Sequence, residues 1–351
     1  MREHSVMGPS IWAVSDGRAG NAAQVRALMA ALSESENWLK LAHIKSAAHR
    51  TDPVSLVPRL PWTLLPGAKW PLPRYALPAE QRQQLRAPWP DLWIAAGRRS
   101  APYTAAVRKW SKGQTKTIQI LDPKRDSADF DLVVVPEHDA LDSPNTMRIT
   151  GSPTHFFEAD LEAAGHRFAD LADHREKSVV VLLGGDSKAH RFTPKDADRL
   201  EHQLRQLAQQ GWRLRLTTSR RTPIEIAAQF RSFANQVGAV FWSGPQDGEN
   251  PFLAWLLYSQ IAIVTEDSAN MLSDVAWHGL PIHIAKLTGR AEKFDRFHQS
   301  LIDAGAARWF EGTLTQWTYP SLREADRVVD RIIEMLLEQH PRPEYAPEVS
   351  L

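Results

Sequence analysis

The chain has 351 residues, of which 43% are hydrophobic and 24% are charged. This balance excludes an intrinsically disordered chain, and the length favours two domains. The absence of cysteine excludes disulfide bonds, thiolate metal sites and a cysteine nucleophile, and fits a reducing compartment. The first residues lack the apolar core of a signal peptide, and no apolar run is long enough to span a bilayer. We therefore expect a cytoplasmic protein, peripheral on the inner membrane face if it contacts a membrane.

The net charge of +1 conceals an uneven distribution along the chain. Between Trp38 and Arg125, lysine and arginine outnumber aspartate and glutamate by 12. Such a segment favours an anionic partner, for example a phosphate, a nucleic acid or an acidic lipid. A basic surface that is merely solvated is the alternative.

Short apolar runs alternate with helical patterns in the first half, which is typical of parallel α/β units. The predicted strands are 11–15, 92–96, 117–121 and 132–135, and the predicted helices are about 22–32 and 97–110.

Residues 52–90 interrupt this pattern with nine prolines, which we expect to prevent regular helices. This insertion is nevertheless too apolar for a solvated linker, since it contains Trp62, Leu64, Leu65, Trp70, Leu72 and Leu77. Their alternation with Arg59, Lys69 and Arg74 suits a membrane interface or a lipid-linked substrate. Alternatively, these side chains fold onto their own domain.

A second α/β series begins near Ser178. The predicted strands are 179–183, 213–217, 239–242, 261–264 and 281–285, and the predicted helices are 194–210, a helix after Pro223, 269–277 and 322–338. We expect an N-terminal domain over 1–152 and a C-terminal domain over 153–351, with Gly-Ser-Pro at 151–153 as a hinge. The final helix either stays in the second domain or crosses back to the first.

The first candidate site is the loop 15–21, which reads SDGRAGN and lies between a predicted strand and helix. Its glycines allow close approach of a ligand, and the helix N-terminus favours anions. The residues concerned are Asp16, Gly17, Arg18, Gly20 and Asn21. A tight turn without a ligand is the alternative.

A second candidate, LGGDSK at 183–188, follows a predicted buried strand. Backbone N–H groups and a lysine suit a diphosphate, so the candidate ligands are Gly184, Gly185, Ser187 and Lys188. An ordinary glycine turn with a surface lysine would give the same sequence.

A third candidate, TSRRTP at 218–223, follows the next strand. Ser219, Arg220 and Arg221 are suitable phosphate or substrate ligands at that position. Thr222 capping a helix before Pro223 needs no ligand, although it leaves the arginines unexplained.

The fourth candidate is VTEDSANMLSDVAWHGLP at 264–281. Ser268 is placed to cap a helix, and Asp274 lies about a turn and a half further on, where its carboxylate could accept both hydroxyls of a ribose. From the residues alone, a capped helix with a surface aspartate is the simpler interpretation.

This fourth stretch resembles the nucleotide-sugar signature of GT-B glycosyltransferases, in which a small-residue turn opens a helix that carries an acidic residue. The resemblance implies that Asp274 binds ribose, and that Ser268, Asn270 and Met271 lie near the phosphates and the base. The aspartate is shorter than the usual glutamate. Residues 184–187 similarly resemble the Gly-Gly-Ser turn after the first strand of the C-terminal domain.

Four motifs in order resemble the bacterial relatives of the plant "elongated mitochondria" fission-protein family, which is described as glycosyltransferase-like. They are SDGRAGNAAQ, LLGGDSKAHRF, TTSRRTP and VTEDSANMLSDVAWHG, and the likeness runs from about Ile11 to Ala285. It implies an α/β fold of two doubly wound Rossmann-like domains facing a central cleft, with the acceptor held by the first and the nucleotide-sugar by the second.

The leading hypothesis is a metal-independent GT-B glycosyltransferase that uses a UDP-sugar or similar donor, without a further cofactor, on a cell-envelope or lipid-linked acceptor. Fixed N–H groups and cations would stabilise the leaving diphosphate. Asp16 is the candidate general base, with His155 and Glu266 in reserve. An Asp16 that only caps the following helix is the alternative.

Other functions remain open from the sequence. A metal-dependent transferase would use Asp129 and Asp131, but this pair precedes a strand, and we expect a turn there. A nucleotide-sugar epimerase shares the fold, and an adaptor that recruits a membrane or protein would retain the scaffold without catalysis. No motif that reads nucleic acid is present, and no oligomeric state is predicted.

Overall fold

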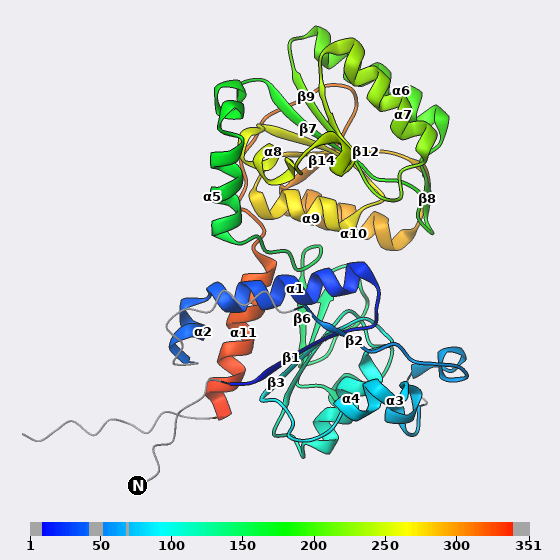
Figure 1. The fold of residues 1–351 in the computed structure, drawn as a ribbon, viewed down its shortest axis with the longest axis vertical. Helices are drawn as coiled ribbons and strands as arrows, with labels where there is room; N and C mark the ends of the chain where they lie inside the picture. Colours follow the sequence, from blue (N-terminus) through cyan, green and yellow to red (C-terminus); the bar gives the residue numbers. More distant parts are fainter. Residues whose placement is uncertain (1–8, 42–51, 68–69, 340–351) are drawn as a thin grey trace, which may run out of the picture. The chain divides into compact units, whose positions relative to one another are not determined.

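A computed structural model describes residues 9–41, 52–67 and 70–339 (Figure 1). Features predicted in residues 1–8 and 42–51, and Lys69, lie outside the described residues. The chain divides into two compact units, which we call unit 1 (residues 1–134 and 325–351) and unit 2 (residues 135–324).

The first six-stranded sheet has the order β2-β1-β3-β4-β5-β6, and its pairs from β2 to β5 are parallel. Its strands are β1 (Ile11–Ser15), β2 (Val54–Ser55), β3 (Leu92–Ala96), β4 (Lys116–Ile120), β5 (Leu132–Pro136) and β6 (Thr146–Ile149). The helices of unit 1 are α1 (Ala19–Glu34), α2 (Glu36–Leu41), α3 (Ala79–Gln84), α4 (Ala101–Trp110) and α11 (Glu324–Gln339), with 3-10 turns η1 (Trp62–Leu64), η3 (Pro73–Ala76) and η4 (Ser127–Asp129).

The proline-rich insertion contributes to the core of unit 1. Trp70 and Leu77 are buried against Trp93 of β3 and Tyr103 of α4, whereas Leu64 stays exposed. Some apolar residues of the insertion therefore pack onto their own domain and others stay exposed, so each of the two alternatives applies to different side chains. The expectation that its prolines prevent a regular helix was wrong at α3, because Pro78 stands just before the first turn, where its missing N–H costs no helical hydrogen bond.

The second six-stranded sheet has the order β10-β9-β7-β11-β12-β14, and all its pairs are parallel. Its strands are β7 (Ser178–Leu183), β9 (Arg213–Thr218), β10 (Val240–Trp242), β11 (Ile261–Thr265), β12 (Ile282–Ala285) and β14 (Ala307–Trp309). The short strands β8 (His190–Arg191) and β13 (Thr288–Gly289) form an antiparallel pair. The helices are α5 (Glu158–Arg167), α6 (Pro194–Gln209), α7 (Ile224–Val237), α8 (Phe252–Tyr258), α9 (Ala269–His278) and α10 (Glu292–Asp303), with 3-10 turns η5 (Ala169–His174) and η6 (Pro245–Asp247).

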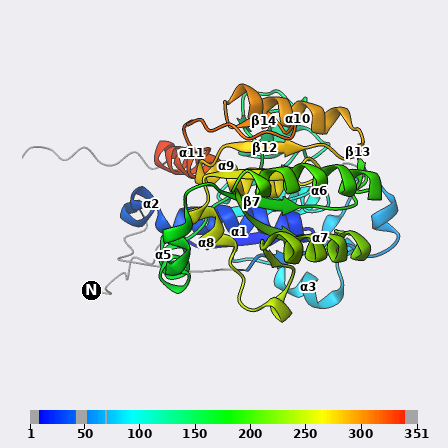
Figure 2. The same ribbon diagram turned by 90° about the horizontal axis from the view of Figure 1, so that it is seen from above.

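Helices cover both faces of the second sheet. Val179 and Val181 of β7 point into a core shared with α6 and α7, which lie side by side (Figure 2). Val180 and Leu182 point to the other face, where α8, α9 and α10 complete a separate core. Successive side chains of a strand alternate between faces, so an unbroken apolar run is the expected sequence for such a strand. The predicted doubly wound α/β fold is confirmed.

Each sheet has one topological switch point, which is the pair of adjacent strands whose following connections run to opposite sides of the sheet. In the first sheet this pair is β1 and β3, because β1 is followed by β2 on one side and β3 by β4 on the other. In the second sheet it is β7 and β11, which are followed by β9 and β12. Ligands of open α/β sheets bind outside the carboxyl ends of the strands at such a point. The chain segments that follow β1 and β3 in unit 1, and β7 and β11 in unit 2, are therefore the places to search for a site.

Candidate functional site

The glycine turn after β7 is joined to the end of β11. The Gly184 N–H donates to Thr265 Oγ1 at 2.7 Å, and the Gly185 N–H donates to Asp267 Oδ2 at 2.9 Å. The parallel pairing of β7 with β11 brings these residues together although they are more than 80 positions apart in the sequence. At the switch point of the second sheet, hydrogen bonds thus connect the segment that follows β7 with the end of β11.

Asp267 is the centre of this network and was missed by the sequence analysis. Its side chain is fully buried, and it accepts from Thr265 Oγ1 at 2.7 Å and from Arg221 Nη2 at 2.8 Å, as well as from Gly185. The Arg221 guanidinium also donates to the Asp186 carbonyl at 3.1 Å. A buried carboxylate needs such partners to offset its lost hydration. The signal in the sequence was an aspartate directly after a buried strand.

The two glycines are required by packing. A Cβ atom on Gly184 would lie 2.0 Å from Asp267 Oδ1, and one on Gly185 would lie 2.0 Å from the Arg221 carbonyl oxygen. Their N–H groups, which we expected to bind phosphate oxygens, are already paired within the protein. Their role in the structure is to hold the turn against Asp267, and any anion has to find its donors beside the turn.

Two cations beside the turn are available to an anion. Lys188 and Arg220 are exposed, and neither forms an ion pair with any residue that the structure describes. Ser187 holds the intervening turn, because its Oγ accepts from the N–H groups of Ala189 and His190 at 3.2 and 3.0 Å. Arg221, in contrast, is already committed to Asp267.

The N-terminus of α9 reaches the same edge of the sheet directly after Asp267. Ser268 caps the helix, as predicted, since its Oγ accepts from the Met271 N–H at 3.4 Å. The first N–H groups of an α-helix have no partner within the helix and carry its partial positive charge. Asn270 is half-buried in this first turn.

Asp274 lies further along α9, partly covered by the segment that precedes α5. Thr154 Oγ1 donates to Asp274 Oδ1 at 3.1 Å, and the Ser152 N–H donates to Ser273 Oγ at 3.0 Å. Burial raises the pKa of the Asp274 carboxyl to about 7. One carboxyl oxygen of Asp274 is therefore bonded to Thr154, and the other has no hydrogen bond to the described residues.

The structure does not bring all the candidate bases to the glycine turn. Glu266 is buried, its carboxylate accepts from the Leu287 N–H at 2.6 Å, and burial raises its pKa. His155 packs against Phe157 and Trp277, with ring centroids 6.1 and 5.8 Å away. Because Trp277 lies in the last turn of α9, about 12 Å along the axis from its start, His155 lies at the opposite end of that helix from the turn.

In unit 1, Asp16 occupies the switch point of the first sheet. Its Oδ1 accepts from Asn21 Nδ2 at 2.8 Å and from the Arg18 N–H at 3.2 Å. These hydrogen bonds stabilise the turn before α1. A Cβ atom on Gly97, after β3, would lie 2.4 Å from Asp16 Oδ2. Helix α1 starts at Ala19, so the predicted loop residues Gly20 and Asn21 are in its first turn.

The aspartates at 129 and 131 lie in the turn that precedes β5, as predicted. Asp131 accepts from the Thr117 N–H at 2.9 Å and from its Oγ1 at 2.8 Å, and Asp129 pairs with Arg125. Within residues 9–41, 52–67 and 70–339, no group of three His, Asp or Glu side chains is arranged to hold a metal ion. Over the same ranges, no helix combines the length and apolarity needed to span a bilayer.

Comparison with known proteins identifies relatives of both the sequence and the fold. Protein ELM1 of Arabidopsis thaliana, named a mitochondrial fission protein, is 24% identical over 279 residues, which cover 72% of this chain but only 65% of that protein. "Uncharacterized protein RP120" of Rickettsia prowazekii (strain Madrid E) is 24% identical over 362 residues, 92% of this chain and 97% of that one. The structure of UDP-GlcNAc 2-epimerase from Methanocaldococcus jannaschii matches with a TM-score of 0.51 at 8% identity, covering 92% of this chain and 99% of that one. At that identity the likeness concerns the fold alone, and it agrees with the predicted GT-B-like class.

The family model described as "Mitochondrial fission ELM1" matches residues 19–336, which is most of the chain. The family resemblance expected from the four sequence motifs is thereby confirmed, and the chain belongs to the Mitochondrial fission ELM1 family.

Proposed function

We propose that unit 2 binds the diphosphate of a nucleoside-diphosphate sugar at the carboxyl edge of its sheet, and that the protein transfers this sugar to a cell-envelope or lipid-linked acceptor. The observation that carries the proposal is that the start of α9 and two exposed cations lie in the segments that follow β11, β7 and β9 at this edge of the sheet. The cations are Lys188 and Arg220, and neither forms an ion pair with a described residue.

The charges at this edge favour an anion. Asp267 is paired with Arg221, Asp186 lies 4.0 Å from Arg191, and the buried Glu266 accepts from the Leu287 N–H. Against these carboxylates, Lys188, Arg220 and the N-terminus of α9 leave an excess of positive charge. A hydrogen bond to a charged group contributes about 1.5–3 kcal/mol, and a helix N-terminus about 0.3–1 kcal/mol. Two such side chains and the helix would thus supply several kcal/mol to diphosphate binding.

Asp274 is the proposed ribose ligand. Thr154 holds its Oδ1, so that Oδ2 is the oxygen that would accept from a ribose hydroxyl. A carboxylate is a stronger acceptor than a carboxylic acid, and the pKa of this group is raised to about 7. Nucleotide affinity should therefore increase as the pH is raised from below to above 7.

The proposed reaction needs these same groups in its transition state. The acceptor oxygen forms a bond to the anomeric carbon, the bond from that carbon to the diphosphate breaks, and the leaving diphosphate takes the negative charge. Cations and helix N–H groups that are fixed beforehand stabilise this charge. A base must take the acceptor proton, and Asp16, with Oδ2 free of the turn that holds Oδ1, remains the candidate.

A thermal-shift panel tests the donor site. Nucleoside diphosphates and nucleotide-sugars would be added with and without EDTA, starting with UDP and UDP-GlcNAc because a protein of the same fold is named for the latter. Binding raises the melting temperature by mass action. We expect one nucleotide to stabilise the protein in EDTA, and the shift to be lost in Asp274→Ala and Arg220→Ala. Arg213→Ala, at the amino end of β9, is the matched control and should bind like the wild type.

The outcomes separate the alternatives. Incubation of the stabilising nucleotide-sugar with the protein, followed by product analysis, distinguishes a 2-epimer from a released nucleoside diphosphate. Absence of stabilisation by every nucleotide would contradict the proposal and favour a recruiting adaptor on the same scaffold. Loss of binding in Arg213→Ala to the same extent as in Arg220→Ala would show that the substitutions act through stability and not through the site.

A further inference from the structure

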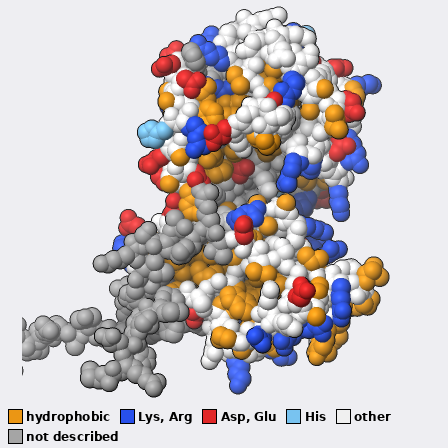
Figure 3. Space-filling model, in the orientation of Figure 1, with side chains coloured by type: hydrophobic (Ala, Val, Ile, Leu, Met, Phe, Trp, Pro, Cys, Tyr) orange, Lys and Arg blue, Asp and Glu red, His pale blue; other side chains and the backbone are white. Residues whose placement is uncertain are grey.

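The insertion of unit 1 exposes an unusual concentration of aliphatic side chains. Of the nine large hydrophobic residues that are strongly exposed among those described, seven lie between Val54 and Tyr75. Four are leucines, Leu60, Leu64, Leu65 and Leu72, which we call the leucine surface; Leu64 is 78% exposed. Figure 3 shows hydrophobic side chains gathered on this projecting segment, with basic side chains beside them. Exposed apolar groups in such a cluster indicate an interaction surface.

The leucines are held outward by a frame that is itself packed. Trp70 is buried, and its ring centroid lies 5.9 Å from that of Trp62 and 5.8 Å from that of Tyr103. Its Nε1 donates to the Leu65 carbonyl at 3.1 Å. The Arg59 N–H donates to the Ala76 carbonyl at 2.8 Å. Trp70 and Leu77 of this segment thus belong to the core of unit 1, while the leucine surface remains in solvent.

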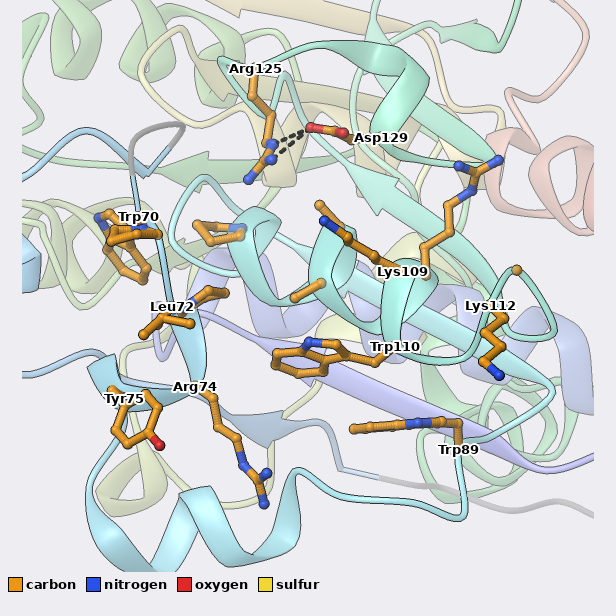
Figure 4. A pocket seen from close by; sticks show the side chains of 17 residues that line it. Trp70, Leu72, Arg74, Tyr75, Trp89, Lys109, Trp110, Lys112, Arg125 and Asp129 are labelled. Carbon is orange, nitrogen blue, oxygen red and sulfur yellow. Dashed lines mark hydrogen bonds and ion pairs between the residues drawn. The ribbon is translucent and has the colours of Figure 1, made fainter.

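Basic residues border the leucine surface at Leu72. Leu72, Arg74 and Tyr75 line an open pocket of about 980 Å³, and Lys109 and Lys112 line the same pocket from α4 and the turn after it (Figure 4). Asp129 is the acidic residue in this lining and is paired with Arg125 at 2.6 Å.

Three cations are available to an anionic partner: Lys109 and Lys112 of this pocket lining, and Arg59, which directly precedes Leu60 in the chain. Arg59, Lys109 and Lys112 are exposed, and none forms an ion pair with a residue that the structure describes. Lysine and arginine beside exposed aliphatic groups form the pattern of a surface that enters the headgroup region of an anionic membrane.

We propose that the leucine surface and its neighbouring cations dock unit 1 onto a bilayer that contains anionic phospholipids. The leucines enter the acyl boundary and the cations contact lipid phosphates. A second copy of the chain is a poor occupant, because a two-fold interface through this surface would bring two sets of these cations into one contact. The proposal is independent of the sugar chemistry proposed for unit 2.

Vesicle flotation with the full chain tests this. Vesicles of phosphatidylcholine alone are compared with vesicles that also contain phosphatidylglycerol, at low and high salt. We expect binding to the anionic vesicles only, weakened by salt. Lys109→Ala/Lys112→Ala should reduce the affinity about fivefold for each charge removed. Leu64→Ser/Leu65→Ser should reduce it at least about tenfold.

Unit 2 supplies matched controls. Ile224 is 82% exposed, so Ile224→Ser removes an exposed aliphatic group elsewhere, and Lys195→Ala removes an exposed lysine; both should bind vesicles like the wild type. All variants alter exposed side chains, and unchanged circular dichroism would confirm that they fold. Failure of the wild type to bind anionic vesicles, equal binding to neutral ones, or full binding by Leu64→Ser/Leu65→Ser would overturn the proposal. Leucine-dependent self-association without vesicle binding would overturn it in favour of a second copy.

Discussion

Replacement of Gly184 by alanine is the sharpest test of the network at the β7/β11 switch point. The added methyl group would lie 2.0 Å from Oδ1 and 2.5 Å from Oδ2 of Asp267. That carboxylate cannot move aside freely, because Thr265, Gly185 and Arg221 hold it at 2.7, 2.9 and 2.8 Å. Relief of the clash therefore breaks at least one of these hydrogen bonds.

The expected cost can be divided into two parts. Overpacking of a buried site costs about 1–3 kcal/mol, and the loss of a charged hydrogen bond costs about 1.5–3 kcal/mol. Gly184→Ala should thus lower the free energy of unfolding by about 3–5 kcal/mol. Gly165→Ala in α5 is the control, because its Cβ atom would lie no closer than 3.4 Å to Tyr258 Oη and alanine favours a helix by about 0.5–1 kcal/mol.

Urea denaturation, with the slope checked for each variant, measures these changes. A double-mutant cycle with Asp267→Ala assigns the cost to the clash. Asp267→Ala is itself destabilising, since it removes the acceptor of the Gly185 N–H and of Arg221 Nη2, but the double variant should be more stable than the sum of the singles by about 2–3 kcal/mol. A Gly184→Ala variant as stable as the wild type, or strict additivity in the cycle, would refute the reasoning.

Two further predictions concern other carboxylates. Asp131→Ala removes a nearly buried group that accepts two hydrogen bonds from Thr117, so it should destabilise the protein by about 3 kcal/mol, whereas Asp129→Ala, at a half-exposed ion pair, should cost less than about 1 kcal/mol. Equal effects in urea denaturation would contradict this assignment. Asp274 binds its proton more tightly in the folded chain, because burial raises its pKa from 3.8 to about 7. Wild-type stability should therefore fall relative to Asp274→Asn as the pH rises from about 4 to about 7, and a difference independent of pH across this range would exclude that burial effect.

Several strands were predictable because their sequences are continuous apolar runs, which is the pattern of a strand buried on both faces of the sheet. The runs that became β5 and β7 are apolar throughout, as strands covered on both faces must be. Elements with weaker patterns were not predicted, among them β6, α8 and α10. The three-residue strand β14 is too short to show any period, and its place beside β12 depends on tertiary pairing.

The site was predictable in its position but less so in its interactions. Glycine turns after buried strands correctly indicated the carboxyl edge of the sheet. The importance of Asp267, however, arises from the register of β11 against β7, which places it beside Gly185; its position directly after a buried strand was the local signal, but that position does not identify its partners. Likewise, hydrophobicity cannot tell Leu77, which is buried, from Leu64, which is exposed, because their difference arises from how the insertion packs.

The central claim is that the β7/β11 edge binds a nucleoside diphosphate, and isothermal titration calorimetry with UDP in EDTA tests it most directly. The wild type, Lys188→Ala/Arg220→Ala and the control Arg213→Ala would be titrated under the same conditions. We expect binding by the wild type and the control, and a loss of at least about tenfold in the double variant, which lacks both free cations. If the double variant bound UDP as tightly as the wild type, or if the wild type bound neither UDP nor any other nucleoside diphosphate, the account of this site would be contradicted.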